Sequence, residues 1–181
     1  WWTHDQGHPH LYKSVTELID SKGNLLDRHT ANVGFRELRL VLNDGAWDMY
    51  PGLPISRPPV PIQIRLNGRN IFAKGTNWVN PEIFPGTIGP HRYEELLEKA
   101  LSANFNLLRC WGGCMANKDY FYHLCDSYGI LVWQEFPLSC NRYGDDRHYL
   151  DVLRREATSI VRRLMGHPSI LLFCGGNELF N

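Results

Sequence analysis

The sequence carries no excess of charge of either sign, no long apolar run and few cysteines. Lysine plus arginine and aspartate plus glutamate each number 19, which gives no support for a nucleic-acid or anionic-membrane partner. No stretch approaches the roughly 18 apolar residues of a membrane-spanning helix. The five cysteines are an odd number, so buried thiols are expected rather than a disulfide framework.

The sequence also lacks a recognisable metal motif. Cys110 and Cys114 have no second pair of ligands to complete a zinc site. His4, His8 and His10 cluster in a segment that is interpreted as a solvated loop. A metal-dependent α/β hydrolase would need two or three His or Asp residues at its strand ends, where this sequence has Asn, Arg, Trp, Gln and Glu. We therefore predict no metal and no cofactor.

What the chain does contain is an alternation of short apolar runs and amphipathic helical patterns. The runs are of a length typical of buried strands, and they cover residues 71–78, 106–113, 130–135 and 170–174. The helical patterns place apolar side chains on one stripe, and they cover residues 91–104, 118–128 and 150–165. Alternating strands and helices are typical of βα units. The sequence thus predicts an α/β fold with a parallel sheet.

Polar or aromatic side chains follow these apolar runs at the same end. Asn177 and Glu178, for example, come directly after the last run and its two glycines. The carboxyl ends of the strands form the rim that carries the catalytic residues of a parallel α/β barrel. A carboxylate beside an amide at that rim suits the chemistry of sugar hydrolysis. The alternative is that Glu178 merely caps a following helix.

The N-terminal part of the chain has the pattern of an antiparallel β structure. Alternating residues predict a β meander of three strands, at 11–18, 25–30 and 35–41.

A connector is expected to follow this β meander. Residues 43–61 are rich in proline and glycine and are interpreted as a loop. Asn67 and Gly68 predict a tight hairpin turn between strands at 62–66 and 70–73.

Four blocks, at residues 74–79, 104–113, 121–136 and 167–178, occur in the order found in one enzyme family. Through them the chain resembles the first half of the catalytic barrel of glycoside hydrolase family 2. The sequences RCWGG at 109–113 and WQEF at 133–136 are closest to its β-mannosidase branch. The ending GGNE at 175–178 is also similar to that of endo-β-mannosidases.

The resemblance implies a division into parts. Residues 71–181 would form the first four βα units of a TIM (β/α)8 barrel. Residues 1–42 would be the C-terminal strands of an immunoglobulin-like β-sandwich, and 43–70 the connector and hairpin. A complete barrel needs about 250 residues. The chain is therefore interpreted as a piece of a larger enzyme that is inactive alone and has the remaining domains as partners.

The resemblance also implies roles for the residues at the rim. Glu178 would be the general acid/base of a retaining β-glycoside hydrolase, with the nucleophile beyond the chain end. The expected substrate is an oligosaccharide or glycoside with a terminal β-D-mannosyl residue. Asn177 would contact its 2-hydroxyl, and Arg109 would keep the nucleophile ionised. Trp111 would offer an apolar face to the sugar, unless it packs in the core.

Three further residues, Asn77, Trp78 and Glu135, are expected near the substrate. Glu135 has an equally supported alternative role as a buried carboxylate paired with an arginine of the barrel. Trp133 is expected in the core.

Two alternatives remain open for the function. One is another β-glycosidase of the family, such as an endo-β-mannosidase or an exo-β-glucosaminidase. The other is a non-catalytic carbohydrate-binding barrel. The sequence does not indicate whether the protein is cytoplasmic, periplasmic or secreted.

Overall fold

The computed structural model describes residues 1–43 and 62–179. The predicted loop at 43–61 lies almost wholly outside these residues. The chain divides into two compact units, one made of Trp1–Phe35 and Lys74–Asn181, the other of Arg36–Ala73. Among the described residues, no helix has the length and apolar character needed to cross a membrane.

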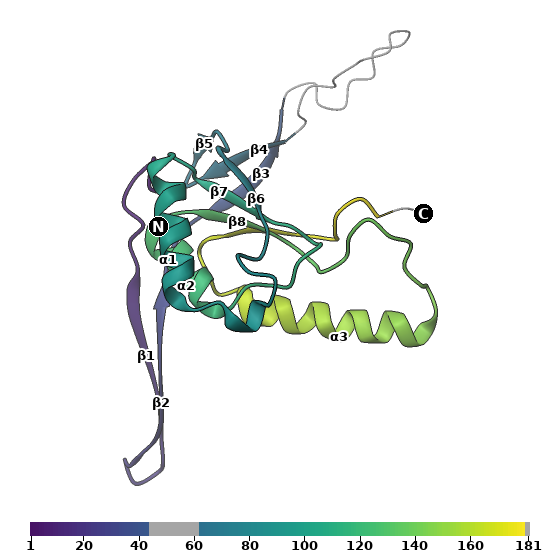
Figure 1. Ribbon diagram of the computed structural model, residues 1–181. Coiled ribbons are helices and arrows are strands. Elements are labelled where there is room, and N and C mark those ends of the chain that lie inside the picture. The colour runs from purple at the N-terminus through teal and green to yellow at the C-terminus, as the bar shows by residue number, and fades with distance from the viewer. Residues whose placement is uncertain (44–61, 180–181) are drawn as a thin grey trace. The chain divides into compact units, whose positions relative to one another are not determined.

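The larger unit contains a four-stranded parallel sheet (Figure 1). The strands lie side by side in sequence order and are β6 (Gly75–Trp78), β7 (Leu107–Cys110), β8 (Leu131–Glu135) and β9 (Ile170–Cys174). The predicted parallel sheet is confirmed. The first strand is shorter than predicted, because β5 (Arg69–Ile71) ends before β6 begins and belongs to another sheet.

Three helices connect these strands, as predicted. They are α1 (Pro90–Ser102), α2 (Asp119–Tyr128) and α3 (Arg147–Leu164), and a short 3-10 helix, η1 (Pro85–Thr87), precedes them. The predicted stop of α2 is confirmed, since Gly129 takes the left-handed conformation with φ 70°. α3 starts earlier than predicted because Asp146 caps it, accepting a hydrogen bond from the backbone N–H of Tyr149 at 3.0 Å.

The hydrophobic core lies between the helices and one face of the sheet. Side chains alternate between the two faces of a strand, and the register aligns Trp78 with Cys110 and Cys110 with Gln134. The Tyr122 hydroxyl of α2 donates to Gln134 Oε1 at 2.7 Å, which identifies this face as the one toward the helices. The core residues of the sheet and of the helices are Trp78, Leu108, Cys110, Val132, Ile170, Tyr93, Leu97, Phe121, Tyr122, Cys125, Ile160 and Leu164.

The opposite face of the sheet carries the residues that precede or follow these core residues along each strand. Asn77 aligns with Arg109, and Arg109 aligns with Trp133. Glu135 lies two residues beyond Trp133, so it projects from the same face. The strand register thus places four polar or aromatic side chains together on the face that the helices do not cover.

The N-terminal strands pair differently from the prediction. β1 (Tyr12–Ile19) and β2 (Leu25–Val33) form an antiparallel hairpin, but β3 (Leu38–Leu42) pairs with β4 (Ile62–Leu66). The predicted three-stranded meander is therefore wrong in its third strand. The cause is visible at Asn67, whose backbone N–H donates to the Glu37 carbonyl and whose Oδ1 accepts from the Glu37 N–H, both at 2.8 Å.

The smaller unit is the antiparallel sheet β3-β4-β5. Its β4–β5 hairpin turns at Asn67 and Gly68, which have φ of 47° and 80°. Two positive φ values in a two-residue loop are typical of the tight turn that Asn-Gly favours, so the predicted hairpin is confirmed.

Candidate active site

Arg109, in β7, connects the four strand ends of the parallel sheet. Its Nε and Nη2 lie 2.8 and 2.7 Å from Glu135 Oε1, at the end of β8. Nη1 donates to Asn77 Oδ1 of β6 at 3.1 Å, and Nη2 donates to Asn177 Oδ1, just after β9, at 2.6 Å. The structure thus brings together four of the residues that the sequence assigned to one rim.

Glu135 is the most buried member of this cluster, with 1% of its side chain exposed. Its Oε2 accepts a hydrogen bond from the Gly112 backbone N–H at 2.7 Å, while Oε1 faces Arg109. Both carboxylate oxygens are engaged, and a charge-assisted hydrogen bond of this kind is stronger than a neutral one. The structure therefore matches the second of the two predicted roles, a buried carboxylate paired with an arginine.

Gly112 makes the contact with Glu135 possible. A Cβ atom at this position would lie 2.5 Å from the Leu138 carbonyl oxygen and 2.7 Å from that of Phe136. Real Cβ atoms do not approach backbone oxygens so closely. Only glycine allows the loop after β7 to pack against the loop after β8 here.

Hydrogen bonds from both its backbone and its side chain fix Asn177 in position. Its backbone N–H donates to the Leu138 carbonyl and its carbonyl accepts from the Cys140 N–H, both at 2.9 Å. Its side-chain Nδ2 makes longer contacts, at 3.3 Å to Ser139 Oγ and 3.2 Å to Cys140 Sγ. With Oδ1 bound by Arg109, the amide group has a fixed orientation, and its N–H groups point to partners that bind weakly.

Glu178 differs from Glu135 in its exposure to solvent and in its contacts. Its side chain is exposed, and the contact described for its carboxylate is with the Cys140 thiol, whose Sγ lies 3.6 Å from Oε2. The backbone has φ 48°, in the left-handed region that non-glycine residues seldom adopt. Such conformations cluster at functional sites. A solvent-accessible carboxylate thus directly follows Asn177, whose side chain accepts a hydrogen bond from Arg109.

Trp111 follows β7 and is half-buried. Its indole ring lies across Gly113, where a Cβ atom would come within 2.1 Å of the ring. A cavity of about 350 Å³ opens beside this turn, between the loops after β7 and β8. Its lining consists of Gly112, Gly113, Cys114, Met115, Pro137, Ser139 and Tyr143.

Trp78 does not join the cluster. It is buried in the core, with its ring centroid 4.9 Å from that of Phe121, and its Nε1 donates to Asn117 Oδ1 at 3.2 Å. The reason is its position one residue after Asn77, which turns it to the helix-covered face of the strand.

Trp133 was expected in the core but shares the uncovered face with Arg109. It is half-buried, and its buried Nε1 has no hydrogen-bond partner among the described residues. The two-residue spacing from Glu135 is the signal in the sequence that could have placed it at this site.

The cysteines have different surroundings. All five are free thiols. Burial raises the pKa of the Cys110 and Cys125 thiols, which makes them poor nucleophiles. Cys140 is exposed at the rim, so the expectation of buried thiols is wrong for this residue.

A parallel sheet whose carboxyl ends collect an arginine, two amides and two carboxylates has the features of a glycoside hydrolase site. Comparisons with known proteins agree. The model of the family "Glycosyl hydrolases family 2" matches residues 1–36. The β-mannosidase of Bos taurus is 36% identical over 179 residues, which cover 98% of this chain and 19% of the bovine protein. Beta-mannosidase A of Emericella nidulans is 33% identical, with 99% of this chain and 19% of the fungal protein covered.

Two solved structures of glycoside-cleaving enzymes superimpose on nearly the whole chain. The β-D-mannosidase from Dictyoglomus thermophilum superimposes with a TM-score of 0.82 at 35% identity, covering 98% of this chain and 20% of that one. The β-glucuronidase 3 of Bacteroides uniformis reaches a TM-score of 0.72 at 25% identity, covering 96% and 19%. The chain is thus similar to β-mannosidases over nearly its whole length, and its first 36 residues match the model of glycosyl hydrolases family 2. It spans about a fifth of the length of the curated relatives that it matches.

Proposed function

We propose that this chain is part of a retaining β-glycoside hydrolase, a β-mannosidase that removes terminal β-D-mannosyl residues from oligosaccharides or glycosides. The single observation that carries the proposal is the set of contacts made by Arg109 with Asn77, Glu135 and Asn177. They bring the ends of four strands together, and an exposed Glu178 directly follows Asn177. The names of the β-mannosidases to which the chain is similar support mannose as the sugar.

The architecture belongs to the same proposal. The four parallel strands and their helices would be the first half of a TIM barrel at 71–181. Residues 1–42 would end an immunoglobulin-like β-sandwich, with residues 43–70 as the connector and hairpin. The remaining domains of the enzyme would complete the barrel and supply the nucleophile. A retaining mechanism requires that second carboxylate about 5 Å from the acid/base.

Glu178 would act as the general acid/base. It would first protonate the glycosidic oxygen and later take a proton from the attacking water. Its accessibility suits both steps, because the proton must pass to the leaving group and come back from water. Its carboxylate accepts a long contact, 3.6 Å, from the Cys140 thiol.

Asn177 and Arg109 would bind the sugar and the nucleophile. Because Arg109 occupies Oδ1 of Asn177, the Nδ2 group of the amide is left to donate. A sugar 2-hydroxyl is a better acceptor than the Cys140 thiol that the Nδ2 group now contacts at 3.2 Å. The guanidinium of Arg109, at the centre of the cluster, would favour the ionised form of a carboxylate on a later strand.

Asn77 and Trp111 would complete the contacts with substrate, and Glu135 would hold Arg109 in place. An aromatic ring suits the C–H face of a pyranoside. We do not assign Trp78 a contact, because its side chain lies on the helix-covered face.

A non-catalytic carbohydrate-binding barrel is a weaker candidate, since Glu178 is present and accessible. The endo-β-mannosidase and exo-β-glucosaminidase alternatives differ only in the sugar or the site of cleavage.

The proposal is tested by the substrate profile of the full-length protein. Nitrophenyl β-mannoside should be hydrolysed with a kcat/KM at least about tenfold above those of the β-glucoside, β-galactoside, β-glucuronide and β-glucosaminide. That ratio corresponds to about 1.4 kcal/mol of discrimination, as expected for one hydroxyl contact. A preference for the glucosaminide, or turnover of internal mannan linkages only, would contradict the assignment to an exo-β-mannosidase. The chain alone should show no turnover.

A further inference from the structure

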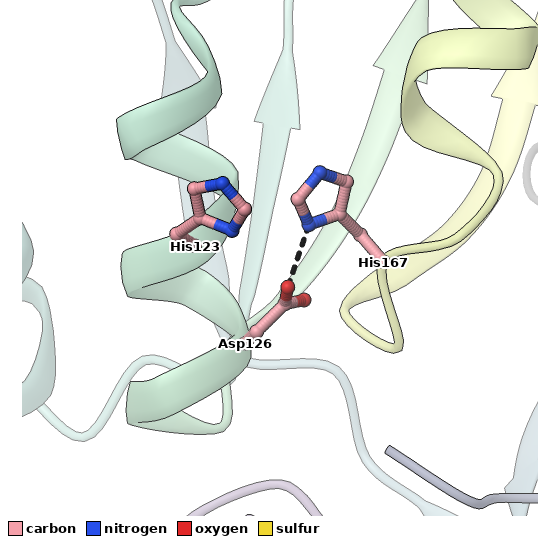
Figure 2. A group of neighbouring side chains, drawn as sticks. All are labelled: His123, Asp126 and His167. Atoms are coloured by element: carbon pink, nitrogen blue, oxygen red, sulfur yellow. Dashed lines mark hydrogen bonds and ion pairs between the residues drawn. The ribbon is translucent and has the colours of Figure 1, made fainter. Parts of the chain in front are cut away.

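Two imidazoles and a carboxylate meet at the other end of the parallel sheet from the candidate active site. His123 and Asp126 lie on α2, and His167 lies in the turn that leads into β9 (Figure 2). One nitrogen of each imidazole and one oxygen of Asp126 all lie within 4.8 Å of one another. The sequence suggested no metal site, because His167 lies 41 positions from Asp126 along the chain.

The carboxylate is fixed in position. Asp126 Oδ1 accepts a hydrogen bond from the Ser169 backbone N–H at 3.0 Å, and 4% of the side chain is exposed. Oδ2 lies 2.6 Å from Nδ1 of His167, a residue that is itself 11% exposed. One oxygen therefore holds the turn, and the other faces the imidazole.

His123 adds a third donor to this pair. Its ring faces the space between Asp126 and His167 in Figure 2, and the two ring centroids are 5.0 Å apart. The Asp126–His167 contact alone would be sufficient to hold the turn before β9. A second imidazole turned toward it creates a set of donors of the kind that a metal ion binds.

We propose that His123, Asp126 and His167 bind one zinc ion. Imidazole and carboxylate donors suit zinc better than magnesium or calcium, which prefer oxygen alone. Zinc bonds to nitrogen and oxygen measure about 2.0–2.2 Å, which puts neighbouring ligand atoms of a tetrahedral site about 3.3 Å apart. The contact between His167 Nδ1 and Asp126 Oδ2 would have to lengthen by only about 0.7 Å. A metal ion at Nδ1 of His167 would be bound by the neutral tautomer that carries its proton on Nε2.

The surroundings leave room for a fourth ligand. His123 is exposed, and it lines a cavity of about 550 Å³ with His167 and His29, from which a water molecule can complete the coordination. Arg163 also borders the cavity, but its guanidinium faces Asp119 Oδ1 at 3.3 Å and donates to the Asn117 carbonyl at 3.0 Å. Its charge is thus partly compensated and directed away from the three donors.

The test uses the full-length protein after removal of metals with a chelator. Titration with Co²⁺ should give the strong visible bands of tetrahedral coordination at one equivalent, and Zn²⁺ should abolish them. His123→Ala should weaken Zn²⁺ binding by about tenfold or more, because even the loss of an outer-shell partner has an effect of this size. His123→Gln serves as a second variant should the first fail to fold, although an exposed residue makes that failure unexpected.

The matched control is His148→Ala, which removes another exposed helical histidine. This variant should bind Co²⁺ and Zn²⁺ as the wild type does. The proposal is overturned if the wild type shows no tetrahedral Co²⁺ spectrum, or if folded His123 variants bind Zn²⁺ with unchanged affinity. Neither readout depends on glycosidase activity, so failure here and failure of the proposed function are distinguishable.

Discussion

Arg109 meets Glu135 through two nitrogens, Nε and Nη2, that share a single carboxylate oxygen. The pair joins β7 to β8, with 28% of the Arg109 side chain and 1% of the Glu135 side chain exposed. Removal of one partner from such a buried pair leaves the other charge without compensation, which is far more costly than loss of a surface ion pair.

Glu135→Ala should lower the free energy of unfolding by about 3–5 kcal/mol, because Arg109 and the Gly112 N–H both lose their acceptor. Urea denaturation of the full-length protein followed by tryptophan fluorescence measures the change. The control is Asp151→Ala, which breaks the exposed ion pair with Arg154 and should cost less than about 1 kcal/mol. Equal losses in the two variants would show that the Arg109–Glu135 pair has no special role.

Glu178→Gln should lower kcat for substrates with poor leaving groups by about 10²–10⁴-fold, because the side chain keeps its shape but can no longer donate a proton. A dinitrophenyl β-mannoside needs little protonation, so the covalent intermediate should form rapidly and accumulate. Azide needs no deprotonation and should restore turnover with a β-configured glycosyl azide as product. Glu156→Gln, an exposed residue of α3, should leave activity unchanged.

The anomeric configuration of that azide distinguishes the two possible roles of Glu178. If it were the nucleophile, no intermediate would accumulate, and rescue of a small-residue variant would give an α-azide. An α-product would therefore overturn its assignment as the acid/base.

Trp78 and Trp133 should respond differently to substitution. Trp78→Phe removes the hydrogen bond to Asn117 and part of the core packing, so it should lower the Tm with little change in KM. Trp133→Phe changes the face that Arg109 shares, so it should change KM or kcat more than the Tm. Steady-state kinetics and thermal unfolding of both variants measure the difference. The reverse pattern would contradict the strand register, which places Trp78 on the helix-covered face and Trp133 on the opposite face.

Asp5 should make stability depend on pH in the acid range. Burial acts to raise the pKa of its carboxyl, but hydrogen bonds led by that from Lys74, together with one from Asn106, outweigh burial and lower it. A lowered pKa in the folded state stabilises the protein at pH values above the unfolded pKa, about 3.9. That contribution is lost as the pH falls through the folded pKa.

Comparison of wild type with Asp5→Asn measures this contribution. The wild type should be the more stable of the two near neutral pH. The difference should shrink below about pH 4, where the carboxyl is protonated first in the unfolded state and, at lower pH, in the folded state. A difference in stability that stays constant down to pH 2 would exclude a role for the charge of Asp5.

The strands and helices of the parallel sheet could be predicted because each is specified by its own sequence. Periodic apolar residues indicate α1, α2 and α3, and the apolar runs that end in polar residues indicate β7, β8 and β9. The cluster at the rim followed, because parallel strands place their carboxyl ends at one edge of the sheet.

Contacts between distant segments could not be predicted in the same way. β3 pairs with β4 because Asn67 holds Glu37 by two hydrogen bonds, which no local pattern reveals. The contact between Asp126 and His167 spans 41 positions of the chain. Trp78 is a different case, because the alternation of side chains along β6 would have turned it away from the rim once Asn77 was placed there.

The left-handed backbone at Glu178 creates a conflict between the stability of the fold and the proposed catalytic role of the side chain. Non-glycine residues in this region carry a conformational cost of about 1–2 kcal/mol, which asparagine tolerates better than glutamate. Selection for thermal stability alone would therefore favour asparagine at this position and eliminate the proposed acid/base. Consensus or stability-guided engineering of this protein should leave residue 178 unchanged, because a more heat-resistant variant could be inactive.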